Sequence, residues 1–285
     1  MSVQDIDAAA WFSILHHGFA AQSFPLGGSA NITVFKKYLL RAGYVNFPFG
    51  IRSEDDHARI MEPDTLEAIR LIGADLLRIN WPQRFGGYAK LSSIRLPEAS
   101  IFALNTWSEE RLDSDLRYKI RRSKREGITL RPATVDDANF IFRMYLETVL
   151  RHGGNRRYTE SYFHALCQTG TQQPGLVALI AEVPSGERCG FNISAYREGT
   201  AYYLHGGMDE KHAQYRPGFV LMGEAITRAR NAGCHEFNFM PSPADQPSLV
   251  QFKKKWGAMV YEINHFDIPL NIKGQLMRAA LHWRH

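Results

Sequence analysis

Three short segments of this chain are the most informative about its architecture: Tyr215-Arg216-Pro217-Gly218, Phe237-Asn238-Phe239 and Gln251-Phe252-Lys253-Lys254-Lys255-Trp256-Gly257. The first is a turn that opens an expected helix over 217–231, the second is a short expected strand, and the third carries lysines on a further helix. The start of a helix leaves backbone N–H groups without partners inside the helix, and these groups can hold a phosphate. The ordered set therefore predicts a site where a phosphate-bearing ligand meets a lysine.

Length and composition are those of a folded enzyme-sized protein. The chain has 285 residues, of which 45% are hydrophobic, and it has no run of about 18 apolar residues that could span a bilayer. The N-terminus is acidic, which argues against a secretory signal, so we expect a cytoplasmic protein without stable membrane insertion. The formal net charge of +5 favours polyanionic partners, and an ordinary basic surface is the competing interpretation.

Neither a disulfide framework nor a metal site is expected. The three cysteines, Cys167, Cys189 and Cys234, show no CxxC spacing and lie among apolar neighbours, which is typical of small core residues. The histidines include no HExxH motif, and the adjacent pair His16-His17 cannot place both rings on one helix face. We therefore expect no metal and no bound cofactor.

The pattern of apolar residues predicts two α/β domains. In the first, over 1–107, helix 5–18 precedes strands near 32–35, 38–40 and 44–47, with Arg41-Ala42-Gly43 as a turn, and helix 63–73 leads to strand 76–80. The second, over 108–266, begins with a capping-box pattern at 108–111 and a helix rich in Lys and Arg. It continues with strand 128–131, two helices, three strands in an antiparallel meander, helix 217–231, strand 236–239, helix 247–256 and strand 259–265. A helical tail is expected over 267–285, with Trp283 among its apolar residues.

This order resembles the GNAT acyltransferase fold, and more closely its two-domain Fem-like aminoacyl transferases and BioF2-like acetyltransferase domains. The resemblance is best over 113–266, and its residues are the basic stretch 117–127, the strand end 203–207, Phe237-Asn238-Phe239 and the segment 252–257. The first third is similar to the degenerate N-terminal half of the same group. The resemblance implies two GNAT-like domains, each with a mixed, mostly antiparallel sheet flanked by helices.

The turn at the start of helix 217–231 bears on the acyl donor. Enzymes of this superfamily that use coenzyme A present a turn with an Arg or Gln followed by two small residues, whereas this chain has Gln214 to Val220 with Pro217 and Phe219 inside it. Proline removes one amide donor. This departure favours the Fem-like branch, in which the donor is an aminoacyl-tRNA, and it leaves acyl-CoA as the alternative.

The resemblance and the residue chemistry together suggest roles for individual side chains. Lys253 is expected to stabilise the oxyanion of the transfer, His205 to accept the amine proton, and Tyr203 to line the substrate channel. For these residues an ordinary structural role is the competing interpretation. The donor site is expected to include Tyr215, Arg216, Gly218, Asn238 and Phe252. Lys36 is expected at the acceptor site, and tRNA contact is expected from Lys119, Arg121, Arg122, Lys124 and Arg125.

The sequence thus favours an N-acyltransferase that forms a peptide bond between the aminoacyl group of an aminoacyl-tRNA and an amine of a peptide or cell-wall precursor. An acyl-CoA-dependent N-acyltransferase acting on an amino sugar or small amine is the first alternative. A module that binds tRNA or another polyanion without catalysis is the second.

Overall fold

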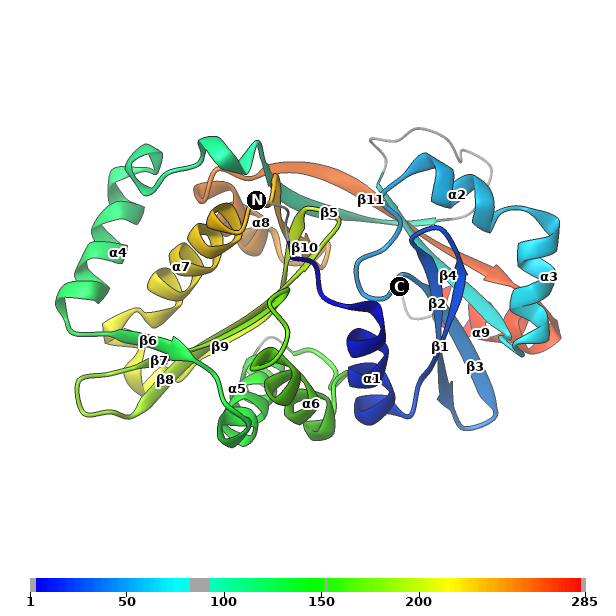
Figure 1. Ribbon diagram of the computed structural model, residues 1–285, viewed down its shortest axis with the longest axis horizontal. Coiled ribbons are helices and arrows are strands. Elements are labelled where there is room, and N and C mark those ends of the chain that lie inside the picture. The colour runs from blue at the N-terminus through cyan, green and yellow to red at the C-terminus, as the bar shows by residue number, and fades with distance from the viewer. Residues whose placement is uncertain (1–3, 83–92, 152, 283–285) are drawn as a thin grey trace. The chain divides into compact units, whose positions relative to one another are not determined.

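The computed structural model of the protein describes residues 4–82, 93–151 and 153–282. These residues form two compact units, shown in Figure 1. The larger unit contains Met1–Gly18, Ala99–Met240 and Gln246–Val260, and the smaller unit contains Phe19–Glu98, Pro241–Asp245 and Tyr261–His285. Each unit is therefore assembled from segments that are not consecutive, and the boundary expected after residue 107 lies inside the larger unit.

In the larger unit the strands of the mixed sheet follow one another in the order β5-β10-β9-β8-β7-β6. Strands β9 and β10 pair in parallel, and β6 through β9 pair antiparallel. The strands are β5 (Ser93–Phe102), β6 (Thr129–Pro132), β7 (Leu176–Glu182), β8 (Arg188–Arg197), β9 (Thr200–Met208) and β10 (Glu236–Pro241). The helices are α1 (Ala8–Phe19), α4 (Ser114–Arg125), α5 (Ala138–Arg151), α6 (Glu160–Gly170), α7 (Pro217–Asn231) and α8 (Pro247–Lys255). Short 3-10 helices cover Leu104–Thr106, Glu109–Arg111, Val135–Asp137 and η5 (Glu210–Tyr215).

Helices cover both faces of this sheet. In Figure 1, α4 and α7 lie on one side of β7, β8 and β9, and α5 and α6 lie on the other. The core under α4 and α7 includes the fully buried side chains of Ile120, Ile226, Phe237 and Trp256. The amphipathic pattern of α7 sets this arrangement, because its apolar side faces the sheet while Pro217 begins the helix. These observations confirm the α/β class with a mostly antiparallel sheet flanked by helices.

The strands of the smaller unit follow one another in the order β1-β2-β3-β4-β11. Among these strands, β3 and β4 pair in parallel and the other neighbours pair antiparallel. Its strands are β1 (Gln22–Gly27), β2 (Ala30–Lys37), β3 (Leu40–Val45), β4 (Leu76–Pro82) and β11 (Met259–Pro269), and its helices are α2 (Glu54–Ile60), α3 (Pro63–Leu71) and α9 (Ile272–His282). Ile32, Ile69, Leu77 and Ile79 are buried in its core. The expected tail helix is present as α9, while Trp283 lies outside the described residues.

The hairpin of β2 and β3 corrects one sequence prediction. The expected turn at Arg41-Ala42-Gly43 is part of strand β3, and the chain reverses instead at Tyr38-Leu39, since Lys37 pairs with Leu40. Gly43 serves close packing rather than the turn. A Cβ at Gly43 would lie 2.5 Å from the Cδ1 of Ile32, so a larger residue there would require the Ile32 side chain to move.

Two further findings concern the described residues as a whole. All three cysteines are buried and unpaired, as their apolar neighbours predicted. No helix in the described ranges combines the length and the apolar character that crossing a bilayer requires.

Candidate active site

The centre of the candidate site is the opening between β9 and β10. These parallel strands pair through Thr200 to Tyr202 on β9 and Glu236 to Asn238 on β10. Beyond these three pairs the strands continue to Met208 and Pro241 without further pairing. The carboxyl ends of parallel strands are a common location for ligand sites, because backbone groups and side chains converge there.

A β-bulge in β9 separates two of the predicted catalytic residues. His205 pairs with Ile193 and Tyr203 pairs with the next residue, Ser194, so Leu204 is an extra residue in β9. Strict alternation would have placed Tyr203 and His205 on the same face of the sheet. The bulge places them on opposite faces instead, so the structure does not bring these two side chains together.

His205 lies in an aromatic cage on the side of α5 and α6. Its Nε2 atom shares a hydrogen bond of 3.1 Å with the Tyr162 hydroxyl, and its ring centroid lies 4.5 to 6.3 Å from four aromatic rings. Those rings belong to Tyr145, Tyr158, Tyr162 and Phe163. Burial lowers the pKa of His205 to about 3, because an imidazolium would lose its hydration there.

The low pKa of His205 affects its predicted role. A general base works best when its pKa lies near the operating pH, and an imidazole of such low pKa is a weak proton acceptor. The Tyr162 hydroxyl is also neutral and keeps its proton, since burial raises its pKa well above the usual value. This environment favours a structural role for His205, as a neutral side chain that holds the cage in place. It disfavours the predicted role, in which His205 removes the amine proton.

Tyr203 lies on the other face, beside a small polar cluster on β8. It packs against the core under α4 and α7, and burial raises its pKa to about 12. Asn192 and Ser194 are buried on the same face and are joined by a hydrogen bond of 3.0 Å. A Cβ at Gly206 would lie 2.0 Å from the Tyr203 hydroxyl oxygen, so the absence of a side chain at Gly206 leaves room for this hydroxyl. The neutral phenol can thus donate a hydrogen bond to a group in the opening.

Lys253 and Asn238 together shape the end of β10. The Lys253 ammonium is buried and donates a hydrogen bond of 2.6 Å to the carbonyl oxygen of Met240. The Asn238 side chain accepts a 2.7 Å hydrogen bond from the Met240 amide and donates one of 3.0 Å to the Ser100 hydroxyl. Met240 has a φ of 61°, a left-handed conformation that is costly for methionine. The two side chains hold both polar groups of Met240 and so stabilise this turn.

The turn before α7 offers few hydrogen-bond donors. Arg216 has a φ of 56°, and Pro217, the first residue of α7, has no N–H group. The Phe219 amide donates to the Arg216 carbonyl oxygen at 3.2 Å. A Cβ at Gly218 would meet nothing within 4 Å. The predicted donor residues Arg216 and Gly218 therefore lie at an accessible helix start that is poor in donors, next to the half-buried Tyr215.

A pocket of about 360 Å³ adjoins this helix start and brings several predicted residues together. Lys119 lies 5.5 Å from the Phe219 ring centroid, and the rings of Phe219 and Phe252 are 6.2 Å apart. Asp115 pairs with Lys119 at 2.6 Å, and its pKa is lowered by this hydrogen bond and by the charges of Lys255 and Arg216. The pocket is lined by Asp115, Leu116, Lys119, Phe219, Ser248, Gln251, Phe252 and Lys255.

The cations of α4 divide into paired and accessible ones. Three of the five predicted tRNA contacts form ion pairs: Lys119 with Asp115, Arg122 with Glu126 and Lys124 with Glu109. Arg121 and Arg125 are exposed, and neither forms an ion pair with any described residue. They are four positions apart and thus project from the same face of α4. These two arginines are the α4 cations best placed to meet a polyanion.

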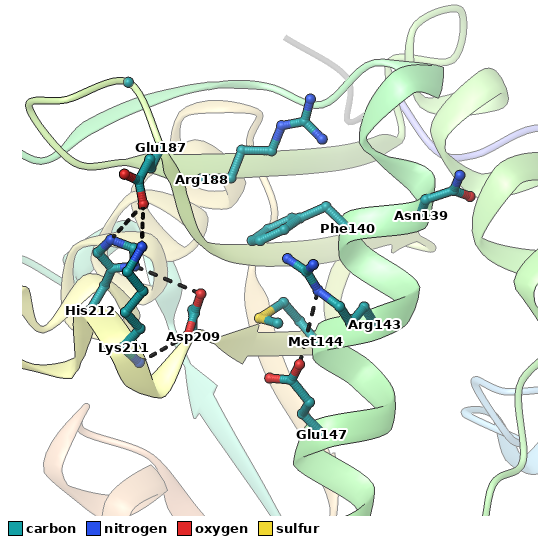
Figure 2. Close-up of a pocket in the computed structure, with 11 residues that line it drawn as sticks. Asn139, Phe140, Arg143, Met144, Glu147, Glu187, Arg188, Asp209, Lys211 and His212 are labelled. Atoms are coloured by element: carbon teal, nitrogen blue, oxygen red, sulfur yellow. Dashed lines mark hydrogen bonds and ion pairs between the residues drawn. The ribbon is translucent and has the colours of Figure 1, made fainter.

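A larger pocket of about 880 Å³ lies beyond the C-terminal end of β9. Figure 2 shows Arg143, Met144 and Glu147 of α5 along one side and Glu187, Asp209 and His212 on the opposite side. The lining carries three basic side chains (Arg143, Arg188 and Lys211) and three acidic ones (Glu147, Glu187 and Asp209). The formal charges of these six side chains therefore balance.

His212 stands out among the residues of this larger pocket. It is buried, and its Nε2 atom lies 3.3 Å from a carboxylate oxygen of Glu187. Its Nδ1 atom lies 3.7 Å from a carboxylate oxygen of Asp209 and forms no hydrogen bond with any described residue. Helix α5, which lines this pocket, packs closely against β9, because a Cβ at Gly207 of β9 would lie 3.5 Å from the Met144 carbonyl oxygen. A ligand group with donors or acceptors would satisfy His212.

Most of the residues around the opening were not predicted from the sequence. The cage tyrosines, Asn192, Ser194 and the pocket residues of η5 belong to segments that are far apart in the chain. The one signal in the sequence that could have pointed to them is the presence of polar residues within the apolar run of β8, since buried polar groups require hydrogen-bond partners. The predicted acceptor residue Lys36 lies in the smaller unit, at the exposed end of β2.

Comparison with known proteins identifies similar folds. The family model described as acetyltransferase (GNAT) domain matches residues 111–254. The crystal structure of FemX is similar with a TM-score of 0.66 at 12% identity, covering 92% of this chain and 93% of FemX. The structure of L-PGS from Bacillus licheniformis gives 0.63 at 16% identity, covering 94% of this chain and 93% of the other. A putative lysylphosphatidylglycerol synthetase domain from Agrobacterium fabrum gives 0.62 at 14% identity, covering 98% and 93%. A search of the curated proteins found none that matches.

Proposed function

Because the chain belongs to the acetyltransferase (GNAT) domain family, we propose that it is an N-acyltransferase whose acyl donor is an aminoacyl-tRNA. The observation that carries the choice of donor is the turn before α7. Pro217 has no N–H group and the Phe219 amide is engaged by Arg216, so the turn holds few donors for a pyrophosphate. The fold similarity to FemX and L-PGS is consistent with this donor.

The proposed reaction forms one amide bond. The neutral nitrogen of the acceptor amine attacks the ester carbonyl of the aminoacyl-tRNA, the C–N bond forms, and the C–O bond to the terminal ribose breaks. The amine proton is transferred to the departing ribose oxygen. Stabilising the negative charge on the tetrahedral intermediate is the main catalytic requirement. We assign Lys253 an indirect role in this stabilisation, because its hydrogen bond to the Met240 carbonyl oxygen holds the turn at the end of β10.

We assign the acceptor to the larger pocket beside β9. An acceptor that carries both an amine and a carboxylate, such as the end of a peptide, matches three basic and three acidic lining residues. A polyanion would meet the acidic side chains there. Arg143, whose contact with Glu147 is a long 3.9 Å, is available to bind the acceptor carboxylate. Arg121 and Arg125 of α4 are assigned to the tRNA backbone.

Transfer of a labelled amino acid from charged tRNAs to a panel of peptide amines tests the proposal. We expect product that disappears when the tRNA is digested with RNase before the reaction. Replacement of both Arg121 and Arg125 by Ser should weaken tRNA binding and reduce its salt dependence, by about one phosphate contact per arginine. Arg122→Ser is the matched control, since Glu126 already neutralises Arg122.

Three results would contradict this assignment. RNase-resistant transfer from acetyl-CoA, together with calorimetric binding of acetyl-CoA, would establish the CoA-dependent alternative. tRNA binding without transfer to any amine in a broad panel would favour a binding module. Equal effects of the double variant and of Arg122→Ser would remove α4 as the tRNA contact.

A further inference from the structure

Large apolar side chains are exposed together at one end of the smaller unit. Tyr38 and Leu39 in the β2–β3 loop are 84% and 80% exposed, Leu71 at the end of α3 is 81% exposed, and Ile272 and Leu276 of α9 are 75% and 67% exposed. These five are half of the ten large apolar side chains that are exposed among the described residues. Such a concentration marks an interaction surface, because single exposed apolar residues are otherwise scattered.

Backbone and side-chain hydrogen bonds of Asp75 join the segments that carry these residues. Its amide and carboxylate bond to the backbone of Arg41, each at 2.8 Å. Its carbonyl oxygen accepts from the Leu270 amide at 2.9 Å, and its carboxylate accepts from the Asn271 side chain at 2.8 Å. The β2–β3 hairpin, the end of β11 and the start of α9 therefore meet at Asp75, and Figure 1 shows α3, α9 and the hairpin on the right-hand side of this unit.

The hairpin loop itself is unusual in a way that packing does not explain. Lys37 pairs with Leu40, which leaves Tyr38 and Leu39 as a two-residue loop, and Tyr38 has a φ of 57°. Loops of this kind strongly favour Asn and Gly, since these residues adopt positive φ readily. A tyrosine in this conformation is strained, and its nearly complete exposure gives no compensating burial within the chain. A strained exposed residue of this kind is a sign of function.

Basic side chains surround the apolar loop. Lys36 and Lys37 directly precede it, Arg41 follows it closely, and Lys273 lies beside Ile272 on α9. Lys36, Lys37 and Lys273 form no ion pair with any described residue, so their charges are available. Apolar and aromatic side chains that enter the headgroup region, together with lysines that meet lipid phosphates, are the combination that binds the surface of an anionic bilayer.

We propose that this surface, formed by Tyr38, Leu39, Leu71, Ile272 and Leu276 with Lys36, Lys37 and Lys273, docks the protein on an anionic lipid bilayer. The contact is peripheral, with the loop inserted at headgroup depth and no segment crossing the membrane. The three lysines form no ion pair with any described residue and lie beside the exposed apolar side chains, which matches the negative charge and apolar interior of an anionic bilayer. The proposal concerns where the protein works and is independent of the acyl donor.

Sedimentation of the full chain with lipid vesicles tests this proposal. Vesicles of phosphatidylcholine mixed with phosphatidylglycerol should bind the protein, and vesicles of phosphatidylcholine alone should bind it weakly. The double substitution Tyr38→Asn and Leu39→Gly should lower the partition constant at least about tenfold, because burying one such side chain already contributes a factor of ten. Replacing Lys36 and Lys37 by Gln should weaken binding mainly at low salt.

Asparagine adopts the positive φ of position 38 more readily than tyrosine, and the Leu39 side chain is exposed, so the double variant is expected to retain its fold, and circular dichroism checks this. Leu150→Asn, at an exposed position of α5 in the larger unit, is the control and should leave binding unchanged. Absence of binding to anionic vesicles would overturn the proposal. So would equal binding by the double variant, or self-association of the wild type that the double variant abolishes while vesicle binding is absent.

Discussion

The pH dependence of stability should reveal how strongly the cage disfavours a charged His205. The pKa of His205 is about 3 in the folded protein and 6.5 in an unfolded chain, so the unfolded state binds its proton first as the pH falls. The contribution of His205 to stability is therefore complete above pH 6.5 and is lost as the pH falls from 6.5 toward 3. Each pH unit between the two values is worth about 1.4 kcal/mol.

The variant His205→Gln isolates this effect from the titration of carboxylates. Glutamine does not titrate and can still form a hydrogen bond with the Tyr162 hydroxyl. Urea unfolding of both proteins from pH 7.5 to 4.5 should show that the wild type loses about 2.7 kcal/mol more than the variant. Titration of the His205 ring by NMR should place its pKa far below 6.5 in the folded state.

A pH-independent difference between wild type and His205→Gln would refute this reasoning. It would mean that the cage does not exclude water and that His205 titrates near its usual pKa. His205 would then regain its predicted role as the proton acceptor. If the low pKa is correct, the rate of transfer should show no change near pH 6.5 that His205→Gln removes.

Three further predictions concern β10 and the hairpin. Lys253→Met should reduce transfer roughly 100-fold, while the exposed neighbour Lys254→Met should not, and equal rates would contradict the role of Lys253. Asn238→Ala removes hydrogen bonds to Met240 and Ser100 and should lower the free energy of unfolding by about 2 kcal/mol in urea, and an unchanged value would show that this turn needs no support. Tyr38→Asn should raise the thermal midpoint by relieving about 1 kcal/mol of strain, and a lower midpoint would show that Tyr38 packs in solution.

The predicted order of elements agrees well with the structure, because local patterns encode it. Helix 217–231 was expected from its apolar spacing, with Pro217 at its start and Gly233 after its end, and α7 covers Pro217–Asn231. The antiparallel meander from β7 to β9 was expected from turn residues between apolar runs. These signals extend over only a few residues, so one sequence is enough to read them.

The errors share a different physical origin. Gly43 was interpreted as a turn residue because glycine usually marks turns, but it lies inside β3 and packs closely against Ile32 on the neighbouring strand. Strand alternation alone would place Tyr203 and His205 on one face, but pairing with β8 inserts Leu204 as a bulge. In both cases a residue distant in the chain decides the outcome, and no local pattern contains that information.

Local chemistry and patterning thus predicted an α/β chain with a helix start that is poor in amide donors, and the order of its motifs resembles the GNAT fold. The tertiary structure alone decided which charges remain available, since ion pairs engage Lys119, Arg122 and Lys124 but not Arg121. It also decided that His205 is neutral and that Lys253 bonds to a backbone carbonyl. Burial and pairing depend on segments brought together by folding, whereas helix and strand patterns depend on neighbours along the chain.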